Sequence, residues 1–173
     1  MTDELVVRQL RSDDDRTEFS SGQEDLDRFF HQYAGQNQFL HHLGATYIAV
    51  EQHATLGFLT VSAASIEVDD LPRSVAKGMP HYPLPVLRIA RIAVDRSAQG
   101  RGVGKALLRA ALEIALNMAE QVGCVGIVVD AKPEAIGFYE RYGFLALDVL
   151  EGQLEERPIP QVMFLPLGSI PSD

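Results

Sequence analysis

The residues with the clearest chemical pattern form one short segment, residues 99–105, which reads Gln-Gly-Arg-Gly-Val-Gly-Lys. It follows a strand-like run over residues 86–94 and precedes an amphipathic helical pattern that begins at Val103. Glycines bring backbone N–H groups close to a ligand, and a helix N-terminus adds unpaired N–H groups and a positive dipole end. Arg101 and Lys105 supply charge-assisted donors. The segment therefore predicts a cradle for a diphosphate.

Spacing argues against two common nucleotide-binding loops. A Walker A loop needs a glycine at position 99 and a hydroxyl residue at position 106, which are Gln99 and Ala106 here. A dinucleotide fingerprint needs a glycine where Lys105 stands. The pattern that does fit is Gln-x-x-Gly-x-Gly, present as Gln99, Gly102 and Gly104.

This pattern resembles the acetyl-CoA diphosphate loop of the GNAT N-acetyltransferase superfamily. Two neighbouring segments extend the resemblance over about residues 86–144. Residues 87–95 are similar to the family's fourth strand, and residues 135–144 are similar to its A-x-x-F-Y-x-x-x-G-F segment. The resemblance implies an α/β fold in one GNAT domain over residues 1–173. Its sheet would be mixed and mostly antiparallel, splayed between the fourth and fifth strands, and flanked by helices.

The resemblance also implies roles for single residues, with acetyl-CoA as cosubstrate. Tyr139 would be the catalytic residue beside the CoA sulfur. Its chemistry is reasonable in itself, because an amine that attacks a thioester expels a thiolate, which a phenol with a pKa of about 10 can protonate. The structural alternative is a core aromatic on the face of a helix. The backbone of Ile92, Ala93 and Val94 would hold the pantetheine arm and polarise the thioester carbonyl. The other cofactor-binding residues would be Gln99, Gly100, Arg101, Gly102, Val103, Gly104, Lys105 and Phe138.

No general base and no metal site are evident from spacing. The five histidines are scattered, so we expect no metal and interpret them as surface or loop residues; they are His31, His41, His42, His53 and His81. An α-amine has a pKa of about 7.7–8.0 and is partly neutral near pH 7, whereas a lysine amine needs more help. The missing base therefore favours an α-amine acceptor, with water carrying the proton away.

Three further segments, residues 19–29, 79–86 and 90–95, resemble the GNAT toxins of bacterial toxin–antitoxin pairs. Those toxins acetylate the α-amine of the amino acid on charged tRNA, which blocks translation, and an antitoxin of ribbon-helix-helix type restrains them. The resemblance implies aminoacyl-tRNA and such an antitoxin as partners, and it leaves a homodimer open. The candidates for contacting the tRNA acceptor end are Arg88, Arg91 and Arg96.

The charge pattern keeps other acceptors open. The 173 residues carry a formal net charge of −9, and residues 1–50 hold nine acids against four bases. Residues 88–109 instead hold six Lys or Arg and one acid, Asp95, which indicates a local anion site. A tRNA partner needs an exposed basic surface beyond the diphosphate loop. The alternatives are a small-molecule or peptide amine, and a binding module with this fold but no turnover.

Composition gives a further expectation about location. No apolar run approaches the roughly 20 residues of a membrane helix, and residues 1–4 do not resemble the start of a signal peptide. The single cysteine, Cys124, lies in the apolar run 122–129, so we expect a buried thiol and no disulfide. These observations favour a cytoplasmic protein with no membrane partner.

The elements that must position these residues follow from periodicity. A capping-box pattern at residues 21–24 precedes Leu26, Phe29, Phe30 and Tyr33 at helical spacing. A helix from Val103 would place Leu107, Ala110, Ile114 and Met118 on one face. The remaining expected elements are strands at 45–51, 56–66, 86–94, 124–129, 144–150 and 161–167, and helices at 71–77 and 133–142.

Overall fold

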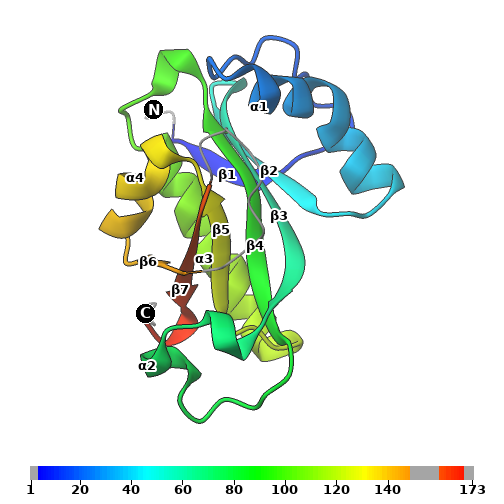
Figure 1. The fold of residues 1–173 in the computed structure, drawn as a ribbon. Helices are drawn as coiled ribbons and strands as arrows, with labels where there is room; N and C mark the ends of the chain where they lie inside the picture. The colour runs from blue at the N-terminus through cyan, green and yellow to red at the C-terminus, as the bar shows by residue number, and fades with distance from the viewer. Residues whose placement is uncertain (1–3, 149–159, 170–173) are drawn as a thin grey trace. The chain divides into compact units, whose positions relative to one another are not determined.

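The computed structural model describes residues 4–148 and 160–169 (Figure 1). Its contacts cluster in two compact units. The first unit consists of Met1–Ser62 and Ile89–Glu113. The second unit consists of Ala63–Arg88 and Ile114–Asp173. Strand β3 (Ala54–Ile66), strand β4 (Leu84–Val94) and helix α3 (Val103–Gln121) contribute residues to both units.

In the first unit the strand order is β1-β2-β3-β4. Strand β1 (Val6–Gln9) pairs antiparallel with β2 (Ala45–Glu51), and β2 pairs antiparallel with β3. The predicted strands at 45–51 and 56–66 are confirmed, although β3 begins two residues earlier than expected. Strand β1 was not predicted, because two apolar residues followed by two polar ones show no alternation.

Helix α1 (Glu24–Arg28) and the π-helical turn Phe29–Tyr33 cover the core of the first unit. Phe30 stacks on Phe58 of β3 with ring centroids 4.6 Å apart. Tyr33, expected on the buried face, is 46% exposed, and Ala34 is buried in its place at 1% exposure. The reason is the π-helical winding, whose wider turn moves the next inward-facing position one residue along the chain.

The predicted capping box does not form. Helix α1 begins at Glu24 after Gln23, which makes no side-chain cap. Ser21 instead accepts a hydrogen bond from the Gln23 N–H at 3.1 Å, and its hydroxyl donates to Asp27 Oδ1 at 2.6 Å. Ser21 thus ties the preceding loop to α1 rather than closing the first helical turn.

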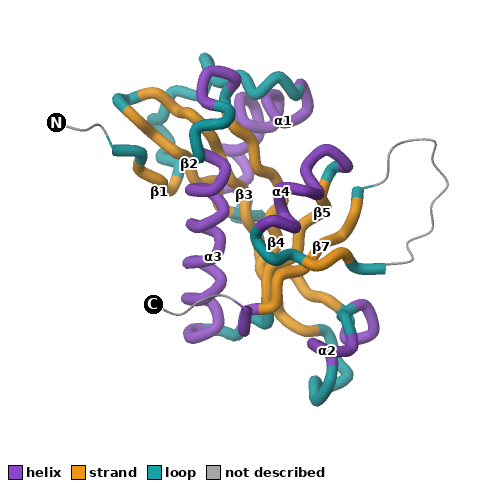
Figure 2. Tube along the Cα trace, turned by 90° about the vertical axis from the view of Figure 1, so that its left-hand side faces the viewer, coloured by secondary structure: helices purple, strands orange, loops and turns teal. Residues whose placement is uncertain are grey.

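Helix α3, the longest helix in Figure 2, has 19 residues and a buried face that departs from the predicted one after Leu107. Val103 and Leu107 are buried as predicted, whereas Ala110, Ile114 and Met118 are only half-buried. The other buried positions of the helix are Leu108, Ala111 and Ala115. Alanine at 111 and 115 permits closer packing than the larger side chains at 114 and 118 would allow.

In the second unit the strand order is β3-β4-β5-β7-β6. Strand β5 (Gly126–Ala131) pairs antiparallel with β7 (Gln161–Pro166), which pairs antiparallel with β6 (Leu145–Ala146). Strands β4 and β5 form the parallel pair of the mixed sheet, and the Val125 N–H donates to the Pro85 carbonyl at 2.8 Å where both strands begin. The predicted α/β fold with a mixed, mostly antiparallel sheet is confirmed.

Besides 3₁₀ turns at Val68–Asp70, Pro133–Ala135 and Leu167–Ser169, the second unit contains the short helices α2 (Arg73–Ala76) and α4 (Ile136–Arg141). Both lie inside predicted helices. Of the expected strand at 144–150, the structure shows Leu145–Ala146, and residues 149 and 150 lie outside the described residues. Cys124 is buried as expected, and its thiol contacts the Gly126 carbonyl at 3.3 Å.

Candidate functional site

The predicted diphosphate loop connects the end of β4 to the start of α3, entirely within the first unit. Asp95 directly follows β4, ahead of residues 99–105, and caps the 3₁₀ turn Arg96–Ala98. Asp95 Oδ2 accepts hydrogen bonds from the Ser97 N–H at 3.0 Å and the Ser97 hydroxyl at 2.6 Å. Partial burial alone would raise the pKa of the Asp95 carboxyl, but the hydrogen bonds from Ser20 and Ser97 outweigh it and hold that pKa below its ordinary value. The turn that leads into the loop therefore begins at an ionised, hydrogen-bonded carboxylate.

The side chain of Gln99, the first residue of the motif, hydrogen-bonds to the protein backbone. Its Nε2 donates to the Ser21 carbonyl at 3.1 Å and to the Val94 carbonyl at 3.2 Å. The amide therefore bonds to the end of β4 and to the segment before α1. This arrangement assigns the Gln99 side chain to loop geometry, whereas the resemblance had grouped Gln99 with the ligand-binding residues.

Two of the three loop glycines, Gly100 and Gly102, adopt the left-handed conformation for which glycine is needed. Gly100 has φ +81° and Gly102 has φ +85°, and a Cβ on either would meet nothing within 4 Å. Both glycines are thus required by backbone conformation rather than by crowding. The first i→i−4 bond after the loop runs from the Ala106 N–H to the Gly102 carbonyl at 3.1 Å. The N–H groups of residues 103–105 lie in the first turn of α3, where backbone N–H groups generally have no i→i−4 partner within the helix.

Gly57 of β3 lies directly against the first turn of α3. A Cβ at this position would lie 2.9 Å from both Val103 Cγ1 and Leu107 Cδ1, and 3.0 Å from the Ala93 carbonyl oxygen. Strand β3 therefore approaches the first turn of α3 and the end of β4 more closely than any side chain at 57 would permit. The pantetheine candidates Ile92 and Val94 are half-buried, and Ala93 between them is buried.

The two predicted cationic donors of the loop differ in their surroundings. Arg101 Nη2 contacts both carboxylate oxygens of Glu51 at 3.1 Å. Lys105 lies exposed on the first turn of α3. Because the Arg101 head is shared with a carboxylate, Lys105 and the backbone N–H groups are the stronger donors for an anion.

Tyr139 lies in α4 of the second unit and is 2% exposed. Its ring makes edge contacts with Phe138 and Phe144, each with centroids 5.2 Å apart. Burial raises the pKa of the Tyr139 phenol well above its ordinary value. The hydroxyl is therefore protonated at neutral pH, which is expected both of a proton donor and of a core aromatic.

The three arginines predicted to contact tRNA have separate environments. Arg88, in the second unit, forms an ion pair with Asp130 at 2.8 Å. Arg91, in the first unit, places its guanidinium 3.8 Å from the centroid of the Phe29 ring, and burial lowers its pKa. Arg96 lines a cleft of about 370 Å³ in the first unit, together with Gly22, Glu24, Asp27, Arg28, His31 and Gln32.

Sequence analysis missed four residues that contact or position the loop: Asp95, Ser20, Ser21 and Gly57. Asp95 was available as a capping signal, because Asp-x-Ser after a strand is typical of a turn or helix start. The contact between the Ser20 segment and residue 95 had no signal, since 75 residues separate them.

The described residues contain neither a metal-binding cluster nor a membrane-spanning helix. In residues 4–148 and 160–169, no cluster of three or more His, Cys, Asp or Glu side chains is arranged to hold a metal ion. Across the same residues, no helix combines the length and apolar character needed to cross a membrane.

Comparison with known proteins gives consistent matches. The family model for an acetyltransferase (GNAT) domain matches residues 42–145. A tRNA-acetylating toxin of Mycobacterium tuberculosis (strain ATCC 25618 / H37Rv) is 35% identical over 140 residues, which is 79% of this chain and 82% of that protein.

Two solved structures resemble the fold over most of the chain. AtaT in complex with acetyl-methionyl-tRNAfMet has a TM-score of 0.82 at 27% identity and covers 96% of both chains. A tyrosine-to-phenylalanine mutant of the AtaT toxin, bound to the C-terminus of the antitoxin AtaR and acetyl-CoA, has a TM-score of 0.75 at 25% identity, with 96% of both chains covered. The family model, the relative and the loop geometry agree, and the protein belongs to the GNAT family of acetyltransferases.

Proposed function

We propose that this protein is an acetyl-CoA-dependent toxin that acetylates the α-amine of the amino acid on charged tRNA. The observation that carries the proposal is the Gln99–Lys105 loop, whose left-handed glycines and open helix start suit a diphosphate, in a chain 35% identical to a tRNA-acetylating toxin over most of both lengths. The AtaT complexes with acetyl-methionyl-tRNA and with acetyl-CoA support the same pair of substrates. Cytoplasm is the compartment in which this reaction would occur.

The loop residues would bind acetyl-CoA through its diphosphate. Backbone N–H groups at residues 103–105 and the Lys105 ammonium meet the negative charge, and the positive end of the α3 dipole adds to it. The backbone of Ile92, Ala93 and Val94 would hold the pantetheine arm and polarise the thioester carbonyl. Phe138, half-buried beside Tyr139, would contribute an apolar contact.

Acyl transfer then needs one nucleophile and one proton donor. The neutral α-amine attacks the thioester carbonyl, so a C–N bond forms and the C–S bond breaks. Tyr139 gives its phenolic proton to the departing sulfur, and water takes the proton that the amine loses and returns one to Tyr139. Because burial disfavours the phenolate, Tyr139 keeps its proton until the thiolate forms and is unsuited to act as the initial base.

Partner control is the second part of the proposal. AtaT binds the C-terminus of its antitoxin AtaR. By analogy we assign this protein an antitoxin of ribbon-helix-helix type, which would restrain its toxicity. Expression without the antitoxin should arrest bacterial growth, and Tyr139→Phe should relieve the arrest.

The decisive assay is transfer of radiolabelled acetyl from acetyl-CoA to a mixture of charged tRNAs, with uncharged tRNA as the control. Label on charged tRNA alone, lost in Tyr139→Phe, is the expected result. Label on small amines or peptide N-termini but not on tRNA would identify the alternative acceptor class. Acetyl-CoA binding without transfer to any amine would identify a binding module.

A further inference from the structure

Two segments far apart in sequence lie side by side in the first unit. Residues 20–22 precede α1, and residues 95–99 lead from β4 into the diphosphate loop. Three hydrogen bonds join them: the Ser20 N–H donates to Asp95 Oδ1 at 2.9 Å, the Arg96 N–H donates to the Ser20 carbonyl at 2.8 Å, and Gln99 Nε2 donates to the Ser21 carbonyl at 3.1 Å. We name residues 20–22 the anchor segment.

Asp95 is the centre of this arrangement, because its two carboxylate oxygens accept hydrogen bonds from two different segments. Oδ1 reaches the anchor segment at Ser20, while Oδ2 caps the turn at Ser97 through two bonds. The Asp95 N–H also donates to the Leu56 carbonyl at 2.7 Å, which fixes the residue to β3. A single residue thus links the loop to both neighbouring segments, to the anchor segment through its side chain and to β3 through its backbone N–H.

The anchor segment is itself held and fits closely. Ser21 donates to Asp27 Oδ1 from its N–H at 2.9 Å and from its hydroxyl at 2.6 Å, so α1 fixes the segment. Gly22 has φ +92°, and a Cβ there would lie 3.0 Å from Arg96 Nε. The loop therefore packs against the anchor segment, which is itself hydrogen-bonded to α1.

We infer that Asp95 and Gln99 are positioning residues for acetyl-CoA, which hold the loop N–H groups in their binding arrangement by fastening the loop to the anchor segment. This inference rests on the proposed function. Neither side chain needs to touch the cosubstrate. A loop ordered before binding loses less conformational entropy when the ligand arrives, so the effect falls on affinity for acetyl-CoA rather than on the chemical step.

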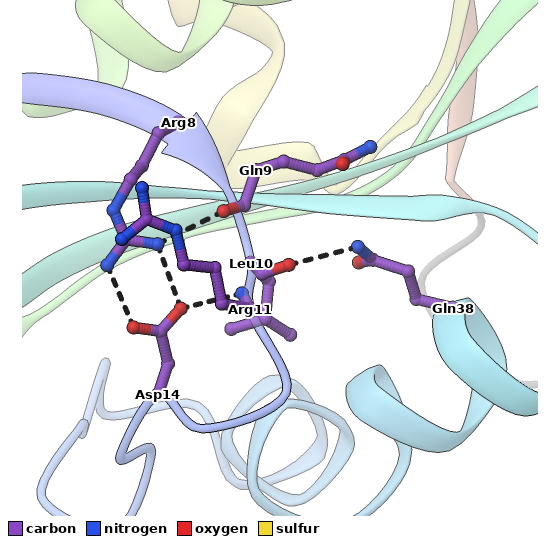
Figure 3. Close-up of polar contacts among 6 residues, drawn as sticks. All are labelled: Arg8, Gln9, Leu10, Arg11, Asp14 and Gln38. Carbon is purple, nitrogen blue, oxygen red and sulfur yellow. Dashed lines mark hydrogen bonds and ion pairs between the residues drawn. The ribbon is translucent and has the colours of Figure 1, made fainter.

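The chain offers a matched control in Asp14, a carboxylate hub of the same kind elsewhere in the first unit (Figure 3). Asp14 accepts from the Arg11 N–H at 2.7 Å and from both terminal nitrogens of Arg8 at 2.8 and 2.9 Å. Like Asp95 it joins a turn to another segment, and hydrogen bonding lowers its pKa. It has no contact of this kind with the diphosphate loop.

The test compares Asp95→Ser with Asp14→Ser in the full chain. Serine at 95 still caps the turn at Ser97 but is too short to reach Ser20, so it separates the capping role from the anchoring role. We expect the Kd and KM for acetyl-CoA to rise about tenfold in Asp95→Ser. We expect kcat at saturating acetyl-CoA to stay within about twofold, and Asp14→Ser to keep the wild-type Kd. Gln99→Met, which keeps the side-chain length but has no donor, should weaken binding in the same direction and serves if Asp95→Ser folds poorly.

Calorimetric titration with acetyl-CoA gives the affinities, and thermal unfolding gives the stability of each variant. Wild-type affinity in both Asp95→Ser and Gln99→Met would overturn the inference while leaving the proposed function intact. Equal loss of affinity in Asp14→Ser would also overturn it, because the effect would then follow general destabilisation. If the wild-type protein itself bound no acetyl-CoA, the proposed function would fail together with the inference.

Discussion

Replacing Gly102 with glutamate should abolish acetyl-CoA binding while leaving the protein folded. The residue has φ +85°, and a Cβ would meet no atom within 4 Å. The conformational cost of a non-glycine residue in this region is about 1–2 kcal/mol, with no clash to add. For a chain of this length that is a fall in Tm of roughly 2–8 °C.

The loss of binding is much larger than the loss of stability. A carboxylate ~5 Å from one charge of a diphosphate costs ~3 kcal/mol at an effective dielectric constant of ~20, which is a loss of ~100-fold or more. The strained backbone also moves the N–H groups that follow Gly102. Both effects act on the ligand and leave the core untouched.

Gly78 supplies the control, because it shares the backbone conformation and the open surroundings but lies in the second unit. Its φ is +82°, and a Cβ there also meets nothing within 4 Å. Gly78→Glu should show a similar fall in Tm and an unchanged Kd, measured by thermal unfolding and by titration with acetyl-CoA. Unchanged affinity in Gly102→Glu, or equal loss in both variants, would refute the assignment of the loop as the diphosphate site.

Two further predictions concern packing and protonation. Gly57→Ala should lower the free energy of unfolding by about 1–3 kcal/mol and weaken acetyl-CoA binding, because the added Cβ presses on Val103, Leu107 and the Ala93 carbonyl; urea titration and calorimetry would show this, and a neutral effect would mean that α3 is free to shift. The raised pKa of Tyr139 means that its contribution to stability is complete below pH ~10 and is lost as the pH rises further, since the buried phenolate is disfavoured. Alkaline unfolding should therefore move to higher pH in Tyr139→Phe, and an identical midpoint in both proteins would contradict the buried hydroxyl.

Much of the loop could be predicted from sequence because its determinants are local. Glycines at 100 and 102 followed by a helical pattern specify a left-handed turn into a helix start, and the structure has that turn. The strand and helix types followed likewise from periodicity and β-branched runs. The parallel position of β5 beside β4 follows once a helix connects them.

Other features depended on which segments meet in space. The sequence suggested one basic cluster of Arg88, Arg91 and Arg96. In the structure Arg88 pairs with an aspartate, Arg91 lies over an aromatic ring and Arg96 lines a cleft. The buried faces of residues 29–34 and of α3 were set by π-helical winding and by close packing at alanines, which a fixed helical period does not capture.

The sequence by itself determined the chemistry that the loop can perform, because backbone freedom at glycine and the charge of a side chain belong to the residue. Only the tertiary structure decided how the loop is held. Asp95 and Gln99 form hydrogen bonds with Ser20 and Ser21, which lie 75 and 78 residues earlier in the chain. Such bonds depend on the folded path of both segments, and no local spacing encodes that path.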